Sequence, residues 1–345
     1  MMLKKVKVNT FQKTHDTRLR DLAYLWNQGS LIKYVINRYR WYLYPKMNKV
    51  APFPLHVDIE TTARCNLRCP MCPSRHLSDD AYGEYGHMDF ELFKRIVDEC
   101  AEKGTFSIRL SWRGEPLVHP RFDACVHYAK IVKRIPNVSF LTNGSLLKGR
   151  LAEKLVEHGV DYISVSIDGL REAYEKIRYP VKLETVLNNL ARLKDMKKRK
   201  GVKKPVIRVT ALWPAIAKDP GAFYQTMRPL CDKVVYNPLK DYSATEPVKT
   251  DFICQFPWER LFVGFDGKVH PCSNTKNPLV VGNIQDDNLE EIWHSSAMRE
   301  LRRLHMDLRR MEIFPCNRCS YGIDYTELWK DRDWVDWDPK ELLPT

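Results

Sequence analysis

Residues 55–75 read LHVDIETTARCNLRCPMCPSR, a strand-like run followed at once by three closely spaced cysteines. In this run Leu55, Val57 and Ile59 alternate with polar residues, and successive side chains of a β-strand point to opposite faces. Five similar runs follow, separated by helix-like segments, at 106–112, 138–143, 162–168, 206–213 and 233–238. Strands that alternate with helices indicate an α/β fold whose parallel sheet is covered by helices.

In each of the six runs one face is polar, and this polar face indicates whether the sheet closes into a full barrel. The first run places Asp58 and Glu60 on one face, and the fourth places Ser166 and Asp168. A closed eight-stranded barrel would fill that face with bulky aliphatic side chains. We therefore predict a partial (β/α)6 barrel with a polar lumen. An antiparallel sheet with one wet face is the alternative, but helical segments intervene at 89–103, 121–134, 148–158, 171–200 and 220–231.

Further segments flank the barrel, which we place at 53–243. Residues 1–52 are rich in aromatic and basic residues and predict a helical N-terminal extension, which either caps the barrel or contacts a membrane surface. Residues 244–253 resemble a linker in composition, 254–320 predict a small cysteine-rich domain, and 321–345 form a C-terminal tail.

Composition narrows the class of protein. The 345 residues carry a net charge of +13 and are 44% hydrophobic, which excludes disordered and collagen-like chains. No apolar run approaches the ~18 residues of a membrane-spanning helix, so we predict a cytoplasmic protein. Thiols stay reduced there, and the ten cysteines are expected to be ligands, catalytic groups or core residues. The positive charge fits a phosphorylated ligand, a nucleic acid, a membrane surface or a plain solvated surface.

Cys65, Cys69 and Cys72 form a C-x-x-x-C-x-x-C array on the loop after the first strand. A structural zinc site uses four ligands in a closed tetrahedron. Three thiolates instead suit a 4Fe-4S cluster with one iron left open for another ligand. The loop follows the carboxyl end of its strand, where β/α folds place their chemistry.

Four motifs at successive strand ends together resemble the radical S-adenosylmethionine enzymes. They are the three-cysteine loop, Gly114-Glu115-Pro116, Thr142-Asn143-Gly144 and Ser166-Ile167-Asp168-Gly169. The resemblance covers 53–243 in order and departs at Arg113, where many members have glycine. It implies that the cluster binds S-adenosylmethionine and cleaves it to a 5'-deoxyadenosyl radical. That radical abstracts a hydrogen atom from the substrate, while protein groups bind, orient and exclude water.

The resemblance also implies which residues hold the cofactor. Glu115, together with the backbone of Gly114, would accept hydrogen bonds from the methionyl ammonium. An arginine would bind a carboxylate through charge-assisted hydrogen bonds. For Asn143 and Ser166, ordinary turn chemistry is the alternative role. The remaining candidates are Met71 for the adenine, Asn143 for the ribose region, and Ser166 and Arg208 for the carboxylate or ribose.

A second set of cysteines, Cys254, Cys272, Cys316 and Cys319, lies in the C-terminal segment, with a predicted hairpin turn at 265–268. Four thiolates satisfy either a zinc site or a closed 4Fe-4S cluster. The segment resembles the auxiliary-cluster domain called SPASM, or twitch in its shorter form, which favours iron-sulfur. Members with two auxiliary clusters carry more cysteines here, so we expect one auxiliary cluster and two 4Fe-4S clusters in all.

The expected reaction follows from the closed auxiliary cluster. If that cluster accepts an electron from the substrate radical, the reaction is alcohol oxidation; if a thiol quenches the radical, it is epimerisation, with Cys231 as the candidate thiol. Glu60 or Asp168 could accept the hydroxyl proton. The polar lumen favours a small polar or phosphorylated substrate, such as a sugar, cyclitol or nucleotide sugar, and flavodoxin or ferredoxin is the expected electron donor. Cys100 and Cys125 are expected to be buried core residues.

Two other classes of protein compete with this prediction. A peptide-modifying maturase would carry the same auxiliary domain but also a leader-binding module, for which residues 1–52 are short. A structural zinc protein that binds nucleic acid would explain the charge of +13 but not the series of strand-end motifs. We therefore expect no nucleic-acid partner.

Overall fold

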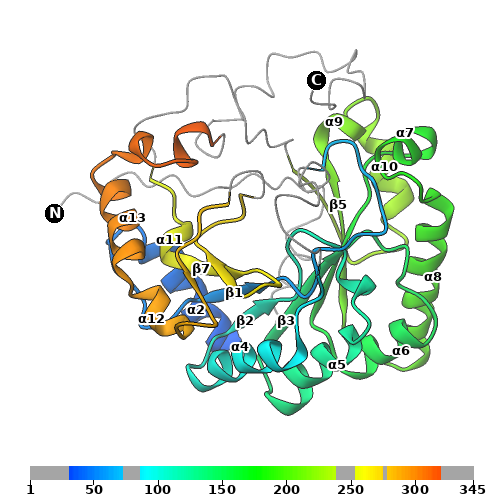
Figure 1. Cartoon of the computed structure of the whole chain (residues 1–345). Coiled ribbons are helices and arrows are strands. Elements are labelled where there is room, and N and C mark those ends of the chain that lie inside the picture. Colours follow the sequence, from blue (N-terminus) through cyan, green and yellow to red (C-terminus); the bar gives the residue numbers. More distant parts are fainter. Residues whose placement is uncertain (1–30, 73–85, 238–252, 275–277, 320–345) are drawn as a thin grey trace.

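The computed structural model describes residues 31–72, 86–237, 253–274 and 278–319, and these contain one mixed sheet (Figure 1). Its strand order is β6-β5-β4-β3-β2-β1-β7-β8-β9. The first six strands pair in parallel, each with its neighbour along the chain, which confirms the parallel prediction and shows that the antiparallel alternative is wrong. They are β1 (His56–Ile59), β2 (Ser107–Arg109), β3 (Asn137–Thr142), β4 (Tyr162–Ser166), β5 (Val206–Leu212) and β6 (Lys233–Asn237).

Helices cover the outer face of this sheet, as predicted. Helix α4 (Phe90–Glu102) begins after Asp89, whose carboxylate accepts hydrogen bonds from two backbone N–H groups of the first turn. The helix expected over 171–200 is two helices, since Pro180 lies between them and cannot continue an α-helix. The other covering helices are α5 (Phe122–His127), which continues as a π-helical turn over Tyr128–Val132, α6 (Gly149–Glu157), α7 (Arg171–Ile177), α8 (Leu183–Arg199), α9 (Trp213–Ile216) and α10 (Pro220–Met227).

The core lies between the sheet and these helices. Val57, Ile108, Val138 and Ile163, one from each of four neighbouring strands, are completely buried. Burying a side chain of this kind contributes about 1.5–3 kcal/mol. The alternate residues of the same strands are mostly polar and include His56, Ser107 and Ser139, which line a pocket on the other face, so the two-residue period of the sequence separates core from lumen.

The C-terminal segment continues the sheet. Strand β7 (Arg260–Val263) pairs in parallel with β1, with Leu261 opposite Val57, and β8 (Lys268–His270) and β9 (Gly282–Asn283) follow antiparallel. The predicted hairpin at 265–268 is confirmed, and Gly267 takes the left-handed conformation there at φ +84°. The barrel and the cysteine-rich segment therefore share one hydrogen-bonded sheet.

Helices α11 (Phe256–Glu259), α12 (Leu289–Trp293) and α13 (Ser296–Met306) complete the C-terminal segment. The carboxylate of Glu99, on α4 of the barrel, accepts hydrogen bonds from Leu289 N and Glu290 N at the start of α12. A carboxylate is favourable at a helix N-terminus because the N–H groups there lack partners. Trp293 Nε1 donates to Ala51 O at 2.8 Å, which joins the C-terminal segment to the end of the N-terminal extension.

Helix α2 (Leu31–Leu43) covers the amino-terminal end of the strands. Asn37 Nδ2 donates to Leu55 O at 3.2 Å, and Trp41 is buried against the start of the barrel. This part of the predicted extension is helical and caps the barrel, whereas residues 1–30, like the predicted tail at 321–345, lie outside the described residues. No helix in the described ranges has the length and apolar character needed to cross a membrane.

Candidate functional site

The three-cysteine loop leaves the carboxyl end of β1 and is held by backbone contacts. Ala63 N donates to Gly86 O at 3.2 Å, and Cys72 N donates to Cys69 O at 3.1 Å. Leu67 N donates to Cys65 Sγ at 3.4 Å. Cys69 is buried and Cys65 and Cys72 are half-buried. Met71, the predicted adenine contact, lies in the turn between the last two cysteines.

Gly114 explains why the next motif begins with glycine. A Cβ at this position would lie 2.3 Å from Thr62 O and 2.6 Å from Arg64 O, so no larger residue fits against the cluster loop. Glu115 N then donates to Arg64 O at 2.8 Å. This close approach places the Glu115 carboxylate directly behind the cysteine loop.

Glu115 is buried and joins two of the predicted motifs. Its Oε1 accepts a hydrogen bond from Thr142 Oγ1 at 2.7 Å, and its Oε2 accepts one from Asn143 N at 2.7 Å. Burial raises the pKa of this carboxyl to about 7, although these hydrogen bonds act in the opposite direction. No cationic side chain pairs with Glu115 in the described residues. A buried carboxylate in this state is suited to receive a cationic ligand group.

Asn143 lies beside Glu115, but most of its amide is already engaged. Its Nδ2 donates to Asn66 Oδ1 at 2.9 Å, and its Oδ1 accepts from Ser145 N and Ser145 Oγ. Asn143 therefore ties the end of β3 to the cysteine loop. Ser166, at the end of β4, is half-buried and its hydroxyl makes no hydrogen bond within the described residues. Of the two, Ser166 has the freer side chain for a cofactor contact.

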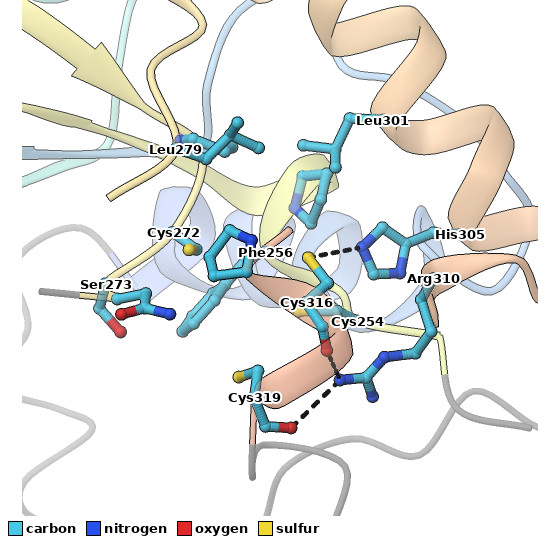
Figure 2. Close-up of a pocket in the computed structure, with 14 residues that line it drawn as sticks. Cys254, Phe256, Cys272, Ser273, Leu279, Leu301, His305, Arg310, Cys316 and Cys319 are labelled. Carbon is cyan, nitrogen blue, oxygen red and sulfur yellow. Dashed lines mark hydrogen bonds between the residues drawn. The ribbon is translucent and has the colours of Figure 1, made fainter. Parts of the chain in front are cut away.

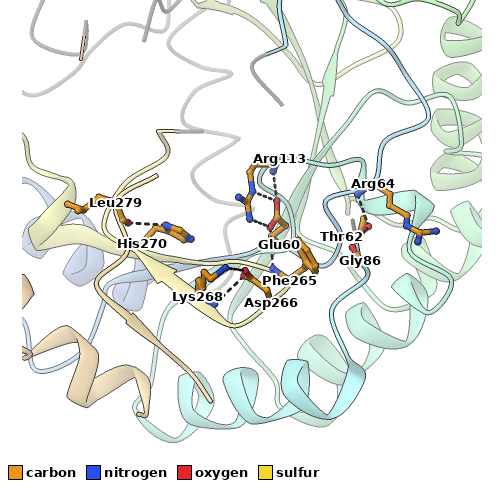
Figure 3. Close-up of polar contacts among 10 residues, drawn as sticks. All are labelled: Glu60, Thr62, Arg64, Gly86, Arg113, Phe265, Asp266, Lys268, His270 and Leu279. Atoms are coloured by element: carbon orange, nitrogen blue, oxygen red, sulfur yellow. Dashed lines mark hydrogen bonds and ion pairs between the residues drawn. The ribbon is translucent and has the colours of Figure 1, made fainter. Parts of the chain in front are cut away.

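Glu60, a predicted proton acceptor, is completely buried and fully engaged (Figure 3). Its Oε1 accepts from Arg113 Nε at 2.6 Å, its Oε2 pairs with Arg113 Nη2, and Phe265 N donates to Oε2 at 3.2 Å. The residue that departs from the family pattern, Arg113, thus pairs with the residue that directly follows β1. This arrangement makes Glu60 a link between β1, the loop after β2 and the β7–β8 turn, and it does not favour proton transfer.

Asp168 is likewise paired, with an arginine that the sequence analysis missed. Its Oδ2 accepts from Arg178 Nε at 2.7 Å, and its Oδ1 accepts from Leu212 N at 2.7 Å. Arg178 Nη1 lies 3.9 Å from Cys69 Sγ, so the guanidinium is held against a predicted cluster ligand. Burial raises the pKa of the Cys69 thiol, and Arg178 opposes this. Arg178 lies outside the four motifs, so no sequence pattern marked it.

Two predicted site residues lie away from the loop. Cys231 precedes β6 at its amino end, is 4% exposed and donates to Met227 O at 3.2 Å. The carboxyl ends of the strands hold the cysteine loop, so the prediction of Cys231 as a hydrogen donor to the substrate is not supported. Arg208 points from the third position of β5 into a pocket at the amino-terminal end of the barrel, where it contacts Ser164 at 3.2 Å. Cys100 and Cys125 are buried core residues, as predicted.

The four C-terminal cysteines come together around one pocket (Figure 2). His305 and Arg310 lie beside them and were missed by the sequence analysis. His305 Nε2 is 3.8 Å from Cys316 Sγ, and Arg310 Nη2 donates to Cys316 O at 2.7 Å and Cys319 O at 3.2 Å. Burial lowers the pKa of His305 to about 4, so its ring is neutral. The pocket contains Cys254, Cys272, Cys316 and Cys319.

Comparison with known families identifies the two parts of the chain. The model of the Radical SAM superfamily matches residues 59–207, and that of the iron-sulfur cluster-binding domain SPASM matches residues 254–320. The chain is a radical SAM enzyme with a SPASM domain. The matched ranges contain the three-cysteine loop and the four-cysteine pocket, respectively.

Similar proteins match this chain over different shares of their length. A tungsten-containing aldehyde ferredoxin oxidoreductase cofactor-modifying protein of Pyrococcus furiosus is 27% identical over 319 residues, covering 77% of this chain and 87% of that protein. The GTP 3',8-cyclase of Chlorobaculum tepidum is 36% identical over 139 residues, about 40% of each chain. Among solved structures, BtrN in complex with AdoMet and 2-DOIA has a TM-score of 0.51 at 22% identity, covering 76% of this chain and 92% of that one. At this identity the likeness concerns the fold.

The residues of this radical SAM enzyme fit iron-sulfur clusters. In the ranges that the structure describes, no three Cys, His, Asp or Glu side chains gather closely enough to share one metal ion. Soft thiolates arranged around a pocket are the usual ligands of a 4Fe-4S cluster. Burial raises the pKa of the Cys65 thiol and of the Cys316 thiol to about 12, so these groups become thiolates only with a cation beside them. Cys65, Cys69 and Cys72 would hold the cluster that binds S-adenosylmethionine, and the SPASM pocket would hold the auxiliary cluster.

Proposed function

We propose that this radical SAM enzyme oxidises an alcohol of a small polar substrate. When bound, the two clusters and S-adenosylmethionine would supply the redox chemistry, namely removal of a hydrogen atom from the substrate carbon and of one further electron. With the release of the hydroxyl proton, the alcohol has lost two electrons and two protons and has become a carbonyl. The chain's own residues hold the cofactor and exclude water.

Glu115 is the observation that carries this proposal. Its buried carboxylate, with a pKa raised to about 7, lies behind the cysteine loop and forms no ion pair within the described residues, although the charge of Arg178 acts to lower that pKa. The ammonium of S-adenosylmethionine would supply the missing positive charge, which stabilises the ionised carboxylate. Ser166 has an available hydroxyl at the same edge of the sheet for a cofactor oxygen.

The positions of the cysteines favour oxidation over epimerisation. Epimerisation needs a thiol that returns a hydrogen atom to the substrate radical, and Cys231 lies at the opposite end of its strand. The four cysteines of the SPASM pocket would close the auxiliary cluster, which leaves electron transfer as its chemical role.

A peptide substrate is the second candidate. The PqqA peptide cyclase of Granulibacter bethesdensis is 26% identical over 288 residues and shares 75% of its length with this chain. SuiB of Streptococcus suis, solved with its precursor peptide, covers 98% of this chain with a TM-score of 0.54. By contrast, the Pyrococcus furiosus relative is named for modifying a cofactor, which favours a small substrate.

The first experiment measures iron, sulfide and 5'-deoxyadenosine on anaerobically reconstituted protein, with and without the triple change Cys65→Ala, Cys69→Ala and Cys72→Ala. We expect about eight irons in the parent and about four in the variant, and 5'-deoxyadenosine from the parent alone. Four or fewer irons in the parent, with zinc present, would exclude oxidation through the auxiliary cluster.

The second experiment tests the substrate class. The parent protein, reduced by flavodoxin, is incubated with cyclitols, aminosugars and nucleotide sugars, and products two mass units lighter are sought by mass spectrometry. Cys231→Ala should retain this activity. A product of unchanged mass but inverted configuration, formed by the parent and lost in Cys231→Ala at unchanged iron content, would restore epimerisation; turnover of peptides alone would replace the small-substrate proposal.

A further inference from the structure

A second pocket lies at the amino-terminal end of the barrel, away from the cysteine loop. It has a volume of about 210 Å³ and is bounded by the first residues of β1 to β4 and by helix α2. This is smaller than the roughly 300–1,000 Å³ of pockets for drug-sized ligands. Four arginines line it, and no carboxylate among the described residues does: Arg38, Arg109, Arg208 and Arg260.

The arginines come from four different elements and converge on the same space. Arg38 lies on α2, Arg109 on β2, Arg208 on β5 and Arg260 on β7. The guanidiniums of Arg38 and Arg260 lie over the Trp41 ring, at 4.2 Å and 4.5 Å from its centroid. These stacking contacts hold two planar forks in fixed orientations at the wall of the pocket.

The nearby acidic residues do not balance this charge. Asp58, behind the pocket wall, pairs with Arg109 and lies 3.5 Å from Arg260, and Arg109 and His56 bring its pKa to about 2 against the effect of burial. Glu259 is also buried and lies 3.7 Å from Arg260; burial raises its pKa, and Arg260 and Arg38 oppose this. Among the described residues, four arginines therefore face two carboxylates.

The other polar groups around the pocket add hydrogen-bonding capacity without adding negative charge. Burial lowers the pKa of His56 to about 4, and its ring is neutral. Burial and the nearby Arg260 and Arg208 also lower the pKa of Arg109, despite the ion pair with Asp58. Like charges gathered in a half-buried space are unfavourable unless an anion joins them.

We propose that this arginine pocket binds the phosphoryl group of inorganic phosphate or of a phosphate monoester. A phosphoryl dianion matches the excess of positive charge, whereas a single carboxylate would balance only part of it. Guanidinium forks bind phosphate oxygens in bidentate fashion, which fixes the orientation of the ligand. The ligand would join α2 to the strands, so binding should also stabilise the fold.

The arginine pocket is distinct from the site at the three-cysteine loop, and its test does not depend on radical chemistry. Inorganic phosphate and phenyl phosphate are titrated by calorimetry into the anaerobically reconstituted full chain, at about 150 mM ionic strength to screen surface charge and with saturating S-adenosylmethionine. Acetate is the control ligand. We expect saturable binding of phosphate and phenyl phosphate, and none of acetate.

Two arginine variants locate the binding. Arg38→Gln and Arg208→Gln should each weaken phosphate binding about tenfold or more, because each removes a charged hydrogen-bond donor. The matched control is Arg192→Gln on the exposed face of α8, which removes the same charge and should leave the Kd unchanged. Circular dichroism and iron content establish that each variant folds. Arg208→Lys keeps the charge without the fork and should give an intermediate Kd.

Several results would overturn the proposal. They are an absence of saturable phosphate binding, acetate binding as tight as phosphate binding, and a Kd of the folded Arg38 and Arg208 variants equal to that of the parent. If Arg208→Gln abolished S-adenosylmethionine cleavage while phosphate binding persisted, Arg208 would belong to the cofactor site. The proposed set of phosphate-binding residues would then be wrong. If the parent protein formed no 5'-deoxyadenosine, the proposed function would be contradicted, but phosphate binding could still be measured.

Discussion

Replacing Glu60 by Gln tests whether this residue joins the SPASM domain to the barrel or acts on the substrate. The side chain keeps its size but loses its charge, and one of its two ends becomes an amide NH2. Arg113 and Phe265 N both donate hydrogen bonds to Glu60 (Figure 3). The new NH2 group is itself a donor, so it cannot accept these bonds. The buried guanidinium of Arg113 loses the carboxylate that accepts its Nε and Nη2 hydrogen bonds.

The expected loss of stability is large because both partners are buried. The side chains of Glu60 and Arg113 are 0% and 3% exposed. Removing one member of such a pair costs about 3–5 kcal/mol of unfolding free energy. At about 2 °C per kcal/mol for a large domain, the melting temperature should fall by roughly 6–10 °C.

The assay is thermal unfolding of the reconstituted protein under anaerobic conditions, followed by intrinsic fluorescence. Glu153→Gln, on the exposed side of α6, is the matched control and should change stability by less than about 0.5 kcal/mol. The double change Glu60→Gln with Arg113→Gln should destabilise by about 1–3 kcal/mol less than the sum of the two single changes. Below its melting temperature, the Glu60 variant should still form 5'-deoxyadenosine.

Two results would refute this reasoning. One is a fall in melting temperature no greater than that of Glu153→Gln, which would mean that the contacts of Glu60 with Arg113 and Phe265 do not stabilise the fold. The other is a well-folded Glu60 variant that cleaves S-adenosylmethionine but no longer converts the substrate, which would restore Glu60 as the proton acceptor.

The remaining predictions concern the cofactor end of the barrel. Gly114→Ala should lower the iron content from about eight to about four per chain, because its methyl group would lie 2.3 Å from Thr62 O and displace the cysteine loop; iron and sulfide analysis measures this. The Glu115 carboxylate, with a pKa raised to about 7, loses its charge below that pH, so the Kd for S-adenosylmethionine should rise about tenfold from pH 8 to pH 6, and Glu115→Gln should remove this dependence in calorimetry. Arg178→Gln removes a positive charge held 3.9 Å from Cys69 Sγ, so an EPR-monitored titration should give a more negative reduction potential for the first cluster; an unchanged potential would contradict the contact.

Most of the barrel could be predicted because its signals are local. Strand alternation repeats within five to eight residues, and each motif follows its own strand, as in the run from Val57 through the cysteine loop. The helical segment expected at 89–103 begins at Asp89, which the structure shows to be the N-cap of α4; a short acidic residue before an apolar periodic run marks a helix start. Both cysteine sets were recognisable by spacing, and the structure brings the four C-terminal cysteines to one pocket.

The missed features depend on pairings that the residue pattern of a single strand does not encode. Glu60 and Asp168 were expected to face a substrate because polar residues on a lumen face look alike in sequence, whether they are free or paired. The partner of Glu60, Arg113, follows β2, and the partner of Asp168, Arg178, follows α7. The pairing of β7 with β1 joins residues about two hundred positions apart, and no periodic pattern in either strand indicates it. Cys231 was a candidate because a thiol can donate a hydrogen atom, but it lies at the amino end of β6, away from the cysteine loop.

The shared sheet has a consequence for electron transfer between the two cysteine sets. The first set follows β1, and the hairpin that leads to Cys272 follows β7, the parallel neighbour of β1. Glu60 N donates to Val263 O at 2.8 Å, so the hydrogen-bonded ladder extends to the carboxyl edge where both connections leave the sheet. A flexible linker would let the separation of the clusters vary, whereas a continuous sheet fixes it. In the proposed oxidation, the substrate must lie within reach of both clusters. The β1–β7 edge of the sheet, next to the Glu60–Arg113 pair, is the part of the fold that sets the distance between the two clusters.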